Sequence, residues 1–295
     1  MNIIVSKYAG FCFGVERAIK LALEAAKKYK KVYTLGELIH NPYEIERLKK
    51  FGVVPVNIDY KDIKKFFKKG DVVIIRSHGV PPKVYKDLKE VKAIVIDATC
   101  PFVKQVHEKV QTLQKENYPT CIFGDPTHPE VIGIAGYVKN PFIVKDIDDL
   151  KKILKKKLTR LGIVCQTTFK VDLFQTLVSK LVLKVKDIKI FNTICSATSL
   201  RQEDAKKLAS KVDIMFIIGG KNSSNTSKLY KVCKEINEKS FFIESEKDIP
   251  KDILERIKYE KYKNIGITAG ASTPKWLIEK VIKFLKELKK EKSLC

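Results

Sequence analysis

Residues 3–12, IIVSKYAGFC, decide the fold that this sequence predicts, because their pattern occurs three times along the chain. An apolar stretch ends at a cysteine, and a segment with helical spacing of apolar residues follows at once. The pattern returns at residues 93–100, AIVIDATC, and at residues 188–195, IKIFNTIC. The three cysteines are Cys12, Cys100 and Cys195. A recurring strand–cysteine–helix pattern indicates an internal threefold repeat.

Two further strand patterns in each repeat end in polar turns, and their spacings also match. The residue 28 positions after the cysteine is polar in every repeat: His40, His128 and Ser223. In the next turn, the matching residues lie 66, 67 and 77 positions after the cysteine: His78, Thr167 and Ser272. One matching spacing would be weak evidence for a repeat, whereas two sets of matching spacings support one structural unit that occurs three times.

Alternating strands and helices predict an α/β fold with mostly parallel sheets. The third repeat ends after its last helix, so only the N-terminal strand can supply its final strand. We therefore predict three pseudo-threefold-related α/β subdomains around a central cluster cavity. Their predicted ranges are 13–98, 99–193, and 194–295 completed by strand 1–12. Ligands of such sheets bind at the carboxyl ends of the strands, where the polar turns lie.

The chain of 295 residues carries a formal charge of +24, from 58 basic and 34 acidic residues. This charge has two interpretations. The lysines either lie on solvated helix faces without a function, or they attract an anionic substrate or an acidic electron carrier. The basic runs lack interleaved aromatic residues, so we expect no nucleic-acid partner. No run of 18 apolar residues occurs, so no membrane span is expected. The N-terminus has the pattern of a strand rather than a signal peptide.

Seven cysteines, an odd number without any CxxC pair, argue against a disulfide framework. We therefore expect a reducing compartment, the cytoplasm or a plastid-type stroma. Four cysteines fall outside the repeat pattern and are predicted to be structural or incidental: Cys121, Cys165, Cys233 and Cys295.

The three repeat-related cysteines are candidate ligands of a soft metal, because a helix N-terminus favours negative charge on sulfur. Catalytic zinc and a cuboidal iron–sulfur cluster both suit three thiolates and one open position. Zinc sites usually have at least two ligands close in sequence, whereas these cysteines lie 88 and 95 residues apart. A four-iron cluster with three protein ligands leaves one iron open to substrate.

The polar turns contain groups that suit a small diphosphate cage. Histidine can donate hydrogen bonds to phosphate, and glycine-rich serine turns at helix starts favour anions. The candidate ligands are His40, His78, His128, Ser223, Ser224, Asn225 and Ser272. No Walker motif or GxGxxG occurs, so a nucleotide is not implied. Glu130 is either a helix N-terminal carboxylate or a proton donor, and the residues alone do not choose between it and Glu44.

Eight segments resemble the signature segments of the 4-hydroxy-3-methylbut-2-enyl diphosphate reductase (LytB/IspH) family, in order over roughly residues 3 to 285. They are YAGFCFGVERA, IIRSHGVPP, IDATCPFV, HPEVIG, GIVCQTT, NTICSAT, GGKNSSNT and GITAGASTP. Tyr8 stands where histidine is common in the family.

The resemblance implies a [4Fe-4S] cluster on Cys12, Cys100 and Cys195, with one iron not ligated by protein. It implies that the seven cage residues meet the substrate diphosphate. It favours Glu130 over Glu44 as the proton source, with Thr167 as relay and Thr168 as an adjacent alternative. The implied enzyme is an iron–sulfur oxidoreductase that converts 4-hydroxy-3-methylbut-2-enyl diphosphate to isopentenyl and dimethylallyl diphosphate, the final step of the methylerythritol phosphate pathway.

Reduced ferredoxin or flavodoxin is the expected electron donor. The alternatives are a non-catalytic iron–sulfur sensor, a zinc-dependent hydrolase that uses the same thiolates, and a lysine-rich RNA-binding module whose binding would fall steeply with salt.

Overall fold

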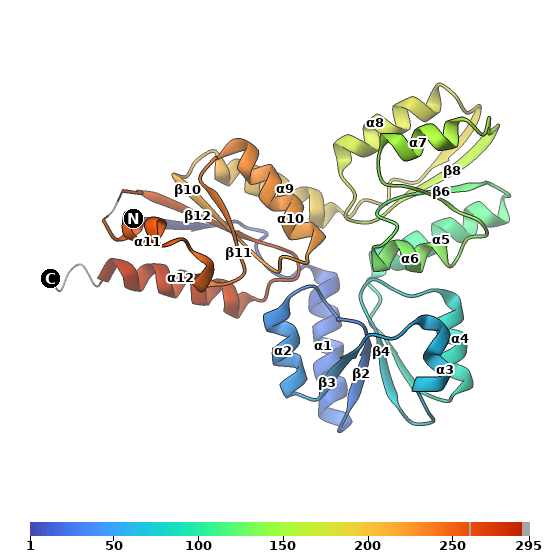
Figure 1. Ribbon diagram of the computed structural model, residues 1–295, viewed down its shortest axis with the longest axis horizontal. Coiled ribbons are helices and arrows are strands. Elements are labelled where there is room, and N and C mark those ends of the chain that lie inside the picture. The colour runs from blue at the N-terminus through green and yellow to red at the C-terminus, as the bar shows by residue number, and fades with distance from the viewer. Residues whose placement is uncertain (260, 291–295) are drawn as a thin grey trace. The chain divides into compact units, whose positions relative to one another are not determined.

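A computed structural model describes residues 1–259 and 261–290, and three parallel sheets of four strands form its framework (Figure 1). The strands of the first sheet are β2 (Val32–Leu35), β3 (Val53–Val56), β4 (Val72–Ile75) and β5 (Ile94–Asp97). Those of the second sheet are β6 (Thr120–Phe123), β7 (Phe142–Val144), β8 (Arg160–Cys165) and β9 (Asp187–Ile190). Those of the third sheet are β1 (Asn2–Val5), β10 (Ile214–Ile218), β11 (Ser240–Ile243) and β12 (Asn264–Ala269).

All three sheets have the same topology. Their strand orders are β3-β2-β4-β5, β7-β6-β8-β9 and β11-β10-β12-β1. In the third sheet, β1 occupies the place that the fourth strand holds in the other two. It pairs in parallel with β12, from Asn2 opposite Asn264 to Val5 opposite Ile267. The prediction that the N-terminal strand completes the third repeat is confirmed, as is the parallel α/β class.

Helices connect the strands, because neighbouring parallel strands need a crossover connection between them. They are α1 (Phe13–Lys28), α2 (Pro42–Lys50), α3 (Ile63–Phe66), α4 (Pro82–Glu90), α5 (Pro101–Lys115), α6 (Pro129–Ala135), α7 (Ile147–Leu154), α8 (Val171–Val182), α9 (Ser196–Ala209), α10 (Ser224–Ile236), α11 (Lys251–Lys258) and α12 (Lys275–Lys290), with short 3-10 turns at Tyr60–Asp62 and Glu246–Asp248. Proline is the first residue of four of them, where its missing N–H costs no helical hydrogen bond. No helix in the described ranges is long and apolar enough to cross a membrane.

Strand β10 shows how a parallel sheet is buried on both faces. Ile214, Phe216 and Ile218 belong to one apolar cluster with residues of α11 and α12. The alternate residues, Met215 and Ile217, belong to another cluster with α9 and α10. Figure 1 shows these two helix pairs on opposite sides of the third sheet. Because side chains alternate along a strand, a continuous apolar run is what two covered faces require.

The strands stop short of the cysteines, contrary to our expectation that they run into them. Strand β1 ends at Val5, β5 at Asp97 and β9 at Ile190. A short turn therefore separates each strand from its cysteine. Before Cys12 the backbone leaves the extended form at Gly10, whose φ is +99°, a conformation that favours glycine.

The described residues group into two compact units. The third-sheet unit consists of Met1–Glu16, Ile39–Arg47 and the described residues from Ser196 onward, and the two-sheet unit consists of Arg17–Leu38 and Leu48–Cys195. Each sheet lies within one of the three predicted subdomain ranges, whose boundaries stay a prediction. Cys295 lies outside the described residues.

Candidate functional site

The three repeat-related cysteines make the same backbone hydrogen bond, each within its own sheet. Their N–H groups donate to carbonyls in the turn after the sheet's third strand: Cys12 to Ala271 (3.1 Å), Cys100 to Ser77 (2.9 Å) and Cys195 to Thr167 (2.8 Å). Each cysteine directly precedes a helix, α1, α5 or α9. The structure therefore gives the three thiols equivalent places at the carboxyl ends of their sheets.

Burial separates these cysteines from the others that the structure describes. Cys12, Cys100 and Cys195 are half-buried, whereas Cys121, Cys165 and Cys233 are fully buried. Burial raises the pKa of Cys165 to about 12 and that of Cys233 to about 12, and it raises the pKa of Cys121 as well. Because the thiolate is the metal ligand, the fully buried thiols are poorly suited to bind metal.

Arg201 fixes the turn that leads to Cys12, and the sequence analysis missed it. Its side chain is 4% exposed and donates from Nε to the carbonyl of Tyr8 and from Nη2 to that of Gly10, both at 2.8 Å. One signal was present in the sequence, because Arg201 falls at helical spacing on the buried stripe of α9, with Thr198, Ala205 and Leu208.

In the third-sheet unit, the Ser223–Asn225 turn begins α10 as an anion-binding turn would. Ser223 Oγ accepts hydrogen bonds from the N–H of Thr226 (3.3 Å) and from Thr226 Oγ1 (3.0 Å). Ser223 Oγ thus accepts two hydrogen bonds, which leaves its hydroxyl proton for donation. The buried Nδ2 of Asn225 has no hydrogen-bond partner among the described residues. A buried donor of this kind at a helix N-terminus suits an anionic ligand.

His40 and Ser272 meet in the same unit. Ser272 Oγ donates to the carbonyl of His40 at 3.0 Å. A Cβ on Gly220 would lie 2.8 Å from that carbonyl oxygen, so only glycine permits this approach of the GGKNSSN turn. Three turns predicted to bind one ligand therefore lie together within the third-sheet unit.

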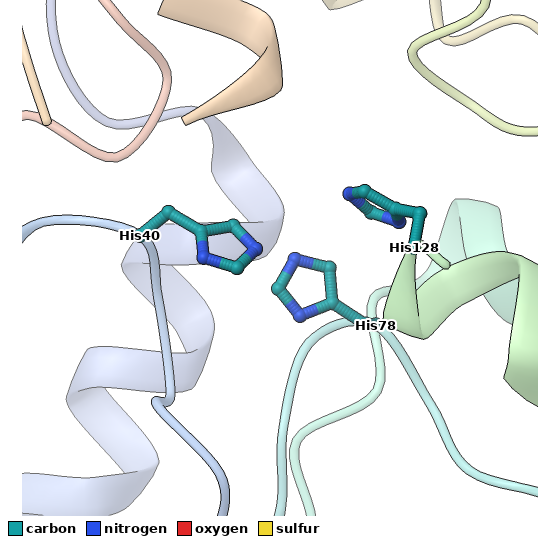
Figure 2. Close-up of side chains that lie close together, drawn as sticks. All are labelled: His40, His78 and His128. Carbon is teal, nitrogen blue, oxygen red and sulfur yellow. The ribbon is translucent and has the colours of Figure 1, made fainter. Parts of the chain in front are cut away.

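His78 and His128 lie side by side in the two-sheet unit (Figure 2). Their ring centroids are 5.4 Å apart and the rings are nearly perpendicular, at 85°. His128 Nδ1 accepts the N–H of Glu130 at 3.2 Å, so neutral His128 carries its proton on Nε2 and can donate it to an anion. Figure 2 also labels His40, which belongs to the third-sheet unit.

Glu130 and Thr167 form a buried pair in the two-sheet unit. Glu130 is 2% exposed, and its Oε1 accepts the N–H of Thr167 at 2.5 Å while its Oε2 accepts the hydroxyl of Thr167 at 2.8 Å. The neighbouring hydroxyl of Thr168 accepts instead from Gln166 Nε2 at 3.0 Å. The carboxyl group thus shares a hydrogen bond with a hydroxyl, as a proton relay requires.

Glu44 has different hydrogen-bond partners from Glu130, although both are buried. Its Oε1 accepts from Arg47 at 2.6 Å and its Oε2 from Trp276 Nε1 at 2.9 Å, so both oxygens are held by protein donors. Glu44 is thus bonded to an arginine and a tryptophan, whereas Glu130 is bonded to Thr167, a difference that the sequence did not reveal.

The structure shifts the repeat register by one residue at two places. Helices α2, α6 and α10 begin at Pro42, Pro129 and Ser224, so the preceding counterparts are Asn41, His128 and Ser223, and not His40. In the later turn, the carbonyl acceptors of the cysteine N–H groups align Ser77, Thr167 and Ala271, which makes Thr168 the counterpart of His78 and Ser272. Equal spacing along the chain therefore overlooked one-residue differences in loop length.

His107 packs beneath the His78–Gly79 turn. Its ring is 5% exposed, stacks on Tyr137 at 4.3 Å, and would lie 2.7 Å from a Cβ on Gly79, whose φ is +73°. Burial lowers the pKa of His107 to about 4 from 6.5, with a small opposing effect of Asp97, which is paired with Lys104 at 2.6 Å. The histidine is therefore neutral in the folded chain at neutral pH.

This buried histidine makes stability depend on pH. The unfolded chain binds a proton at His107 as pH falls below 6.5, whereas the folded chain does not until about 4, so stability is lost as pH falls. Between pH 7.5 and pH 5.0 we expect His107 to cost about 2 kcal/mol of unfolding free energy. Urea denaturation at both pH values should show this loss reduced in His107→Phe, and an equal loss in both proteins would contradict it.

Comparison with known proteins agrees with this arrangement. The family model for LytB protein matches residues 3–286. The 4-hydroxy-3-methylbut-2-enyl diphosphate reductase of Aquifex aeolicus is 47% identical over 98% of this chain and 97% of its own length. The enzyme of the same name from Clostridioides difficile is 44% identical over 98% of this chain and 100% of its own length.

Two solved structures share the fold. One, of (E)-4-hydroxy-3-methyl-but-2-enyl diphosphate reductase, described as the terminal enzyme of the non-mevalonate pathway, has 46% identity and a TM-score of 0.73, covering 97% of this chain and 100% of that one. The other, the E-1-hydroxy-2-methyl-but-2-enyl-4-diphosphate reductase from Plasmodium falciparum, has 32% identity and a TM-score of 0.84, covering 97% and 87%. With a family model matched over nearly its whole length and relatives well above 40% identity, this chain belongs to the LytB protein family.

Proposed function

We propose that this chain is an oxidoreductase that reduces 4-hydroxy-3-methylbut-2-enyl diphosphate to isopentenyl and dimethylallyl diphosphate. Each turnover consumes two electrons and two protons. The allylic C–O bond breaks, one proton leaves with the hydroxyl as water, and the other adds to one of two allylic carbons. The observation that carries the proposal is the buried Glu130–Thr167 pair, in a chain whose full-length relatives are named for this reaction.

The chemistry of the three half-buried thiols fits a [4Fe-4S] cluster with one iron not ligated by protein. We propose that Cys12, Cys100 and Cys195 hold it, because they alone among the described cysteines are partly exposed and directly precede helices. When bound, the cluster supplies electrons and a Lewis-acid site.

Diphosphate binding is proposed for two groups of residues, one in each unit. In the third-sheet unit, Ser223, Ser224 and Asn225 offer hydroxyl and amide donors at the start of α10, and His40 and Ser272 lie on neighbouring turns. In the two-sheet unit, His78 and His128 offer imidazole donors. Donors held by their own hydrogen bonds, as Ser223 and His128 are, bind phosphate oxygens with little loss of side-chain entropy.

We further propose that Glu130 supplies a proton to the leaving hydroxyl and that Thr167 relays it. A protonated Glu130 donates to the Thr167 hydroxyl, which in turn donates to the substrate oxygen. Burial of the pair keeps this proton from exchanging with bulk water. The electrons come from reduced ferredoxin or flavodoxin, acidic proteins that a net charge of +24 would attract, in a reducing compartment.

Anaerobic purification followed by a turnover assay tests the function. We expect about four irons per chain, the content of one four-iron cluster, and reduction of the hydroxylated allylic diphosphate with a reduced viologen dye. A chain without iron, even after anaerobic reconstitution, would contradict the cluster. About one zinc per chain would support the hydrolase instead, and iron without turnover would support the sensor.

A further inference from the structure

The backbone N–H of Glu44 takes part in the cap at the N-terminus of α2. Asn41 Oδ1 accepts the N–H of Glu44 at 3.1 Å just before α2, and Pro42 occupies the first helical position. In a capping box, the acidic residue at this position reaches back to the backbone of the cap. Here its carboxylate turns elsewhere, to Arg47 in the same helix and to Trp276, 232 positions along the chain at the start of α12.

The contacts of Glu44 are those that a buried charge needs. The side chain is 0% exposed, and a carboxylate removed from water is costly unless it is paired and hydrogen-bonded. Arg47 supplies the opposite charge, and the indole N–H of Trp276 supplies a directional donor. Arg47 and Trp276 together bond both oxygens of the Glu44 carboxylate, which therefore links α2 to α12.

The contact between Glu44 and Trp276 attaches a short segment to a different unit from the chain on either side of it. Residues Ile39–Arg47 belong to the third-sheet unit, although the chain on either side of them belongs to the two-sheet unit. Within the third-sheet unit, two hydrogen bonds attach the segment: one at His40 itself, whose carbonyl accepts from Ser272, and one at Glu44, whose carboxylate accepts from Trp276.

We propose that Glu44 is a positioning residue for diphosphate binding, which acts by holding the segment 39–47 on α12 through Trp276. The inference rests on the proposed function, because it concerns the placement of His40 beside Ser272. The carboxylate does not touch substrate. It fixes the backbone from which a substrate-binding histidine projects, so its loss weakens binding and leaves proton transfer intact.

Two conservative variants test this. Trp276→Phe removes the indole N–H and keeps an aromatic ring, and Glu44→Gln keeps the shape of the side chain and removes its charge. We expect each to raise KM for the hydroxylated diphosphate about tenfold and to change kcat less than about twofold, since the lost interaction is the same in ground and transition states. In the double variant, the effect should be smaller than the product of the two single effects, because both changes act on the contacts of the same Glu44 carboxylate.

A matched control separates positioning from general stability. Lys280→Met breaks another ion pair of α12, that of Lys280 with Glu246 at 2.7 Å, without touching the segment 39–47. It should loosen the packing of α12 at a different point and leave KM unchanged. Equal rises of KM in Lys280→Met and Trp276→Phe would overturn the proposal, because any loosening of α12 would then suffice.

Trp276 also gives a readout that does not depend on turnover, because it is the one tryptophan of the sequence. Its fluorescence should shift in Glu44→Gln, and binding of inorganic diphosphate, measured by calorimetry, should weaken about tenfold in both variants, or about 1.4 kcal/mol. Wild-type protein that neither binds inorganic diphosphate nor turns over substrate would overturn the proposed function. Active wild-type protein with unchanged KM in both variants would overturn the positioning role alone.

Discussion

Replacing Glu130 by glutamine is expected to lower kcat about 1000-fold, within the range that loss of a general acid produces. The amide keeps the shape of the side chain and an oxygen that can accept the N–H of Thr167, but it has no acidic proton to give. Single-turnover measurements with the reduced, iron-loaded protein would isolate this step. KM and iron content should stay near the wild-type values.

Glu44→Gln is the matched control, because Glu44 is equally buried and equally well bonded. The two variants should differ in the kinetic constant that they change. Glu130→Gln should lower kcat, whereas Glu44→Gln should raise KM. Thr167→Val should follow Glu130→Gln in kcat, whereas Thr168→Val should not, since the hydroxyl of Thr167 contacts Glu130. Wild-type kcat in Glu130→Gln would rule out this carboxyl group as the proton source.

Cys100→Ser should abolish turnover, to below about 1% of wild type, and remove most of the iron, because an alcohol oxygen is a poor ligand where a soft thiolate is required. The visible absorbance of the anaerobic protein and its iron content measure the loss directly. The N–H of residue 100 would still bond to the carbonyl of Ser77, so the local fold should persist.

The control for this variant is Cys233→Ala. Cys233 lies in the apolar cluster beneath α9 and α10, and its removal should cost about 1 kcal/mol of stability, a typical value for a core truncation. Iron content and turnover should not change. Full iron in Cys100→Ser, or loss of iron in Cys233→Ala, would contradict the assignment of ligands.

The fold could be predicted in detail because it follows from local patterns that occur three times. Apolar runs such as VVII in β4 are buried in full, and Pro101 begins α5 as expected. The completion of the third sheet by β1 could also be predicted, because counting strands left one place empty. Repetition supplied the information that a single strand pattern lacks.

The sequence could not choose between Glu44 and Glu130, because the choice depends on contacts distant along the chain. Trp276 lies 232 positions from Glu44, and Thr167 lies 37 positions from Glu130. The one-residue shift that puts Asn41 before α2 likewise depends on how a turn closes, which spacing alone does not report. Arg201 was overlooked because arginine is mostly a surface residue.

The pairing of β1 with β12 sets the order of events when the protein is synthesised. The ribosome releases β1 long before its partner β12, because Asn2 lies opposite Asn264. The N–H of Cys12 likewise waits for the carbonyl of Ala271. The two-sheet unit can fold while translation continues, whereas Cys12 reaches its native position only after β12 and the turn that follows it have been synthesised.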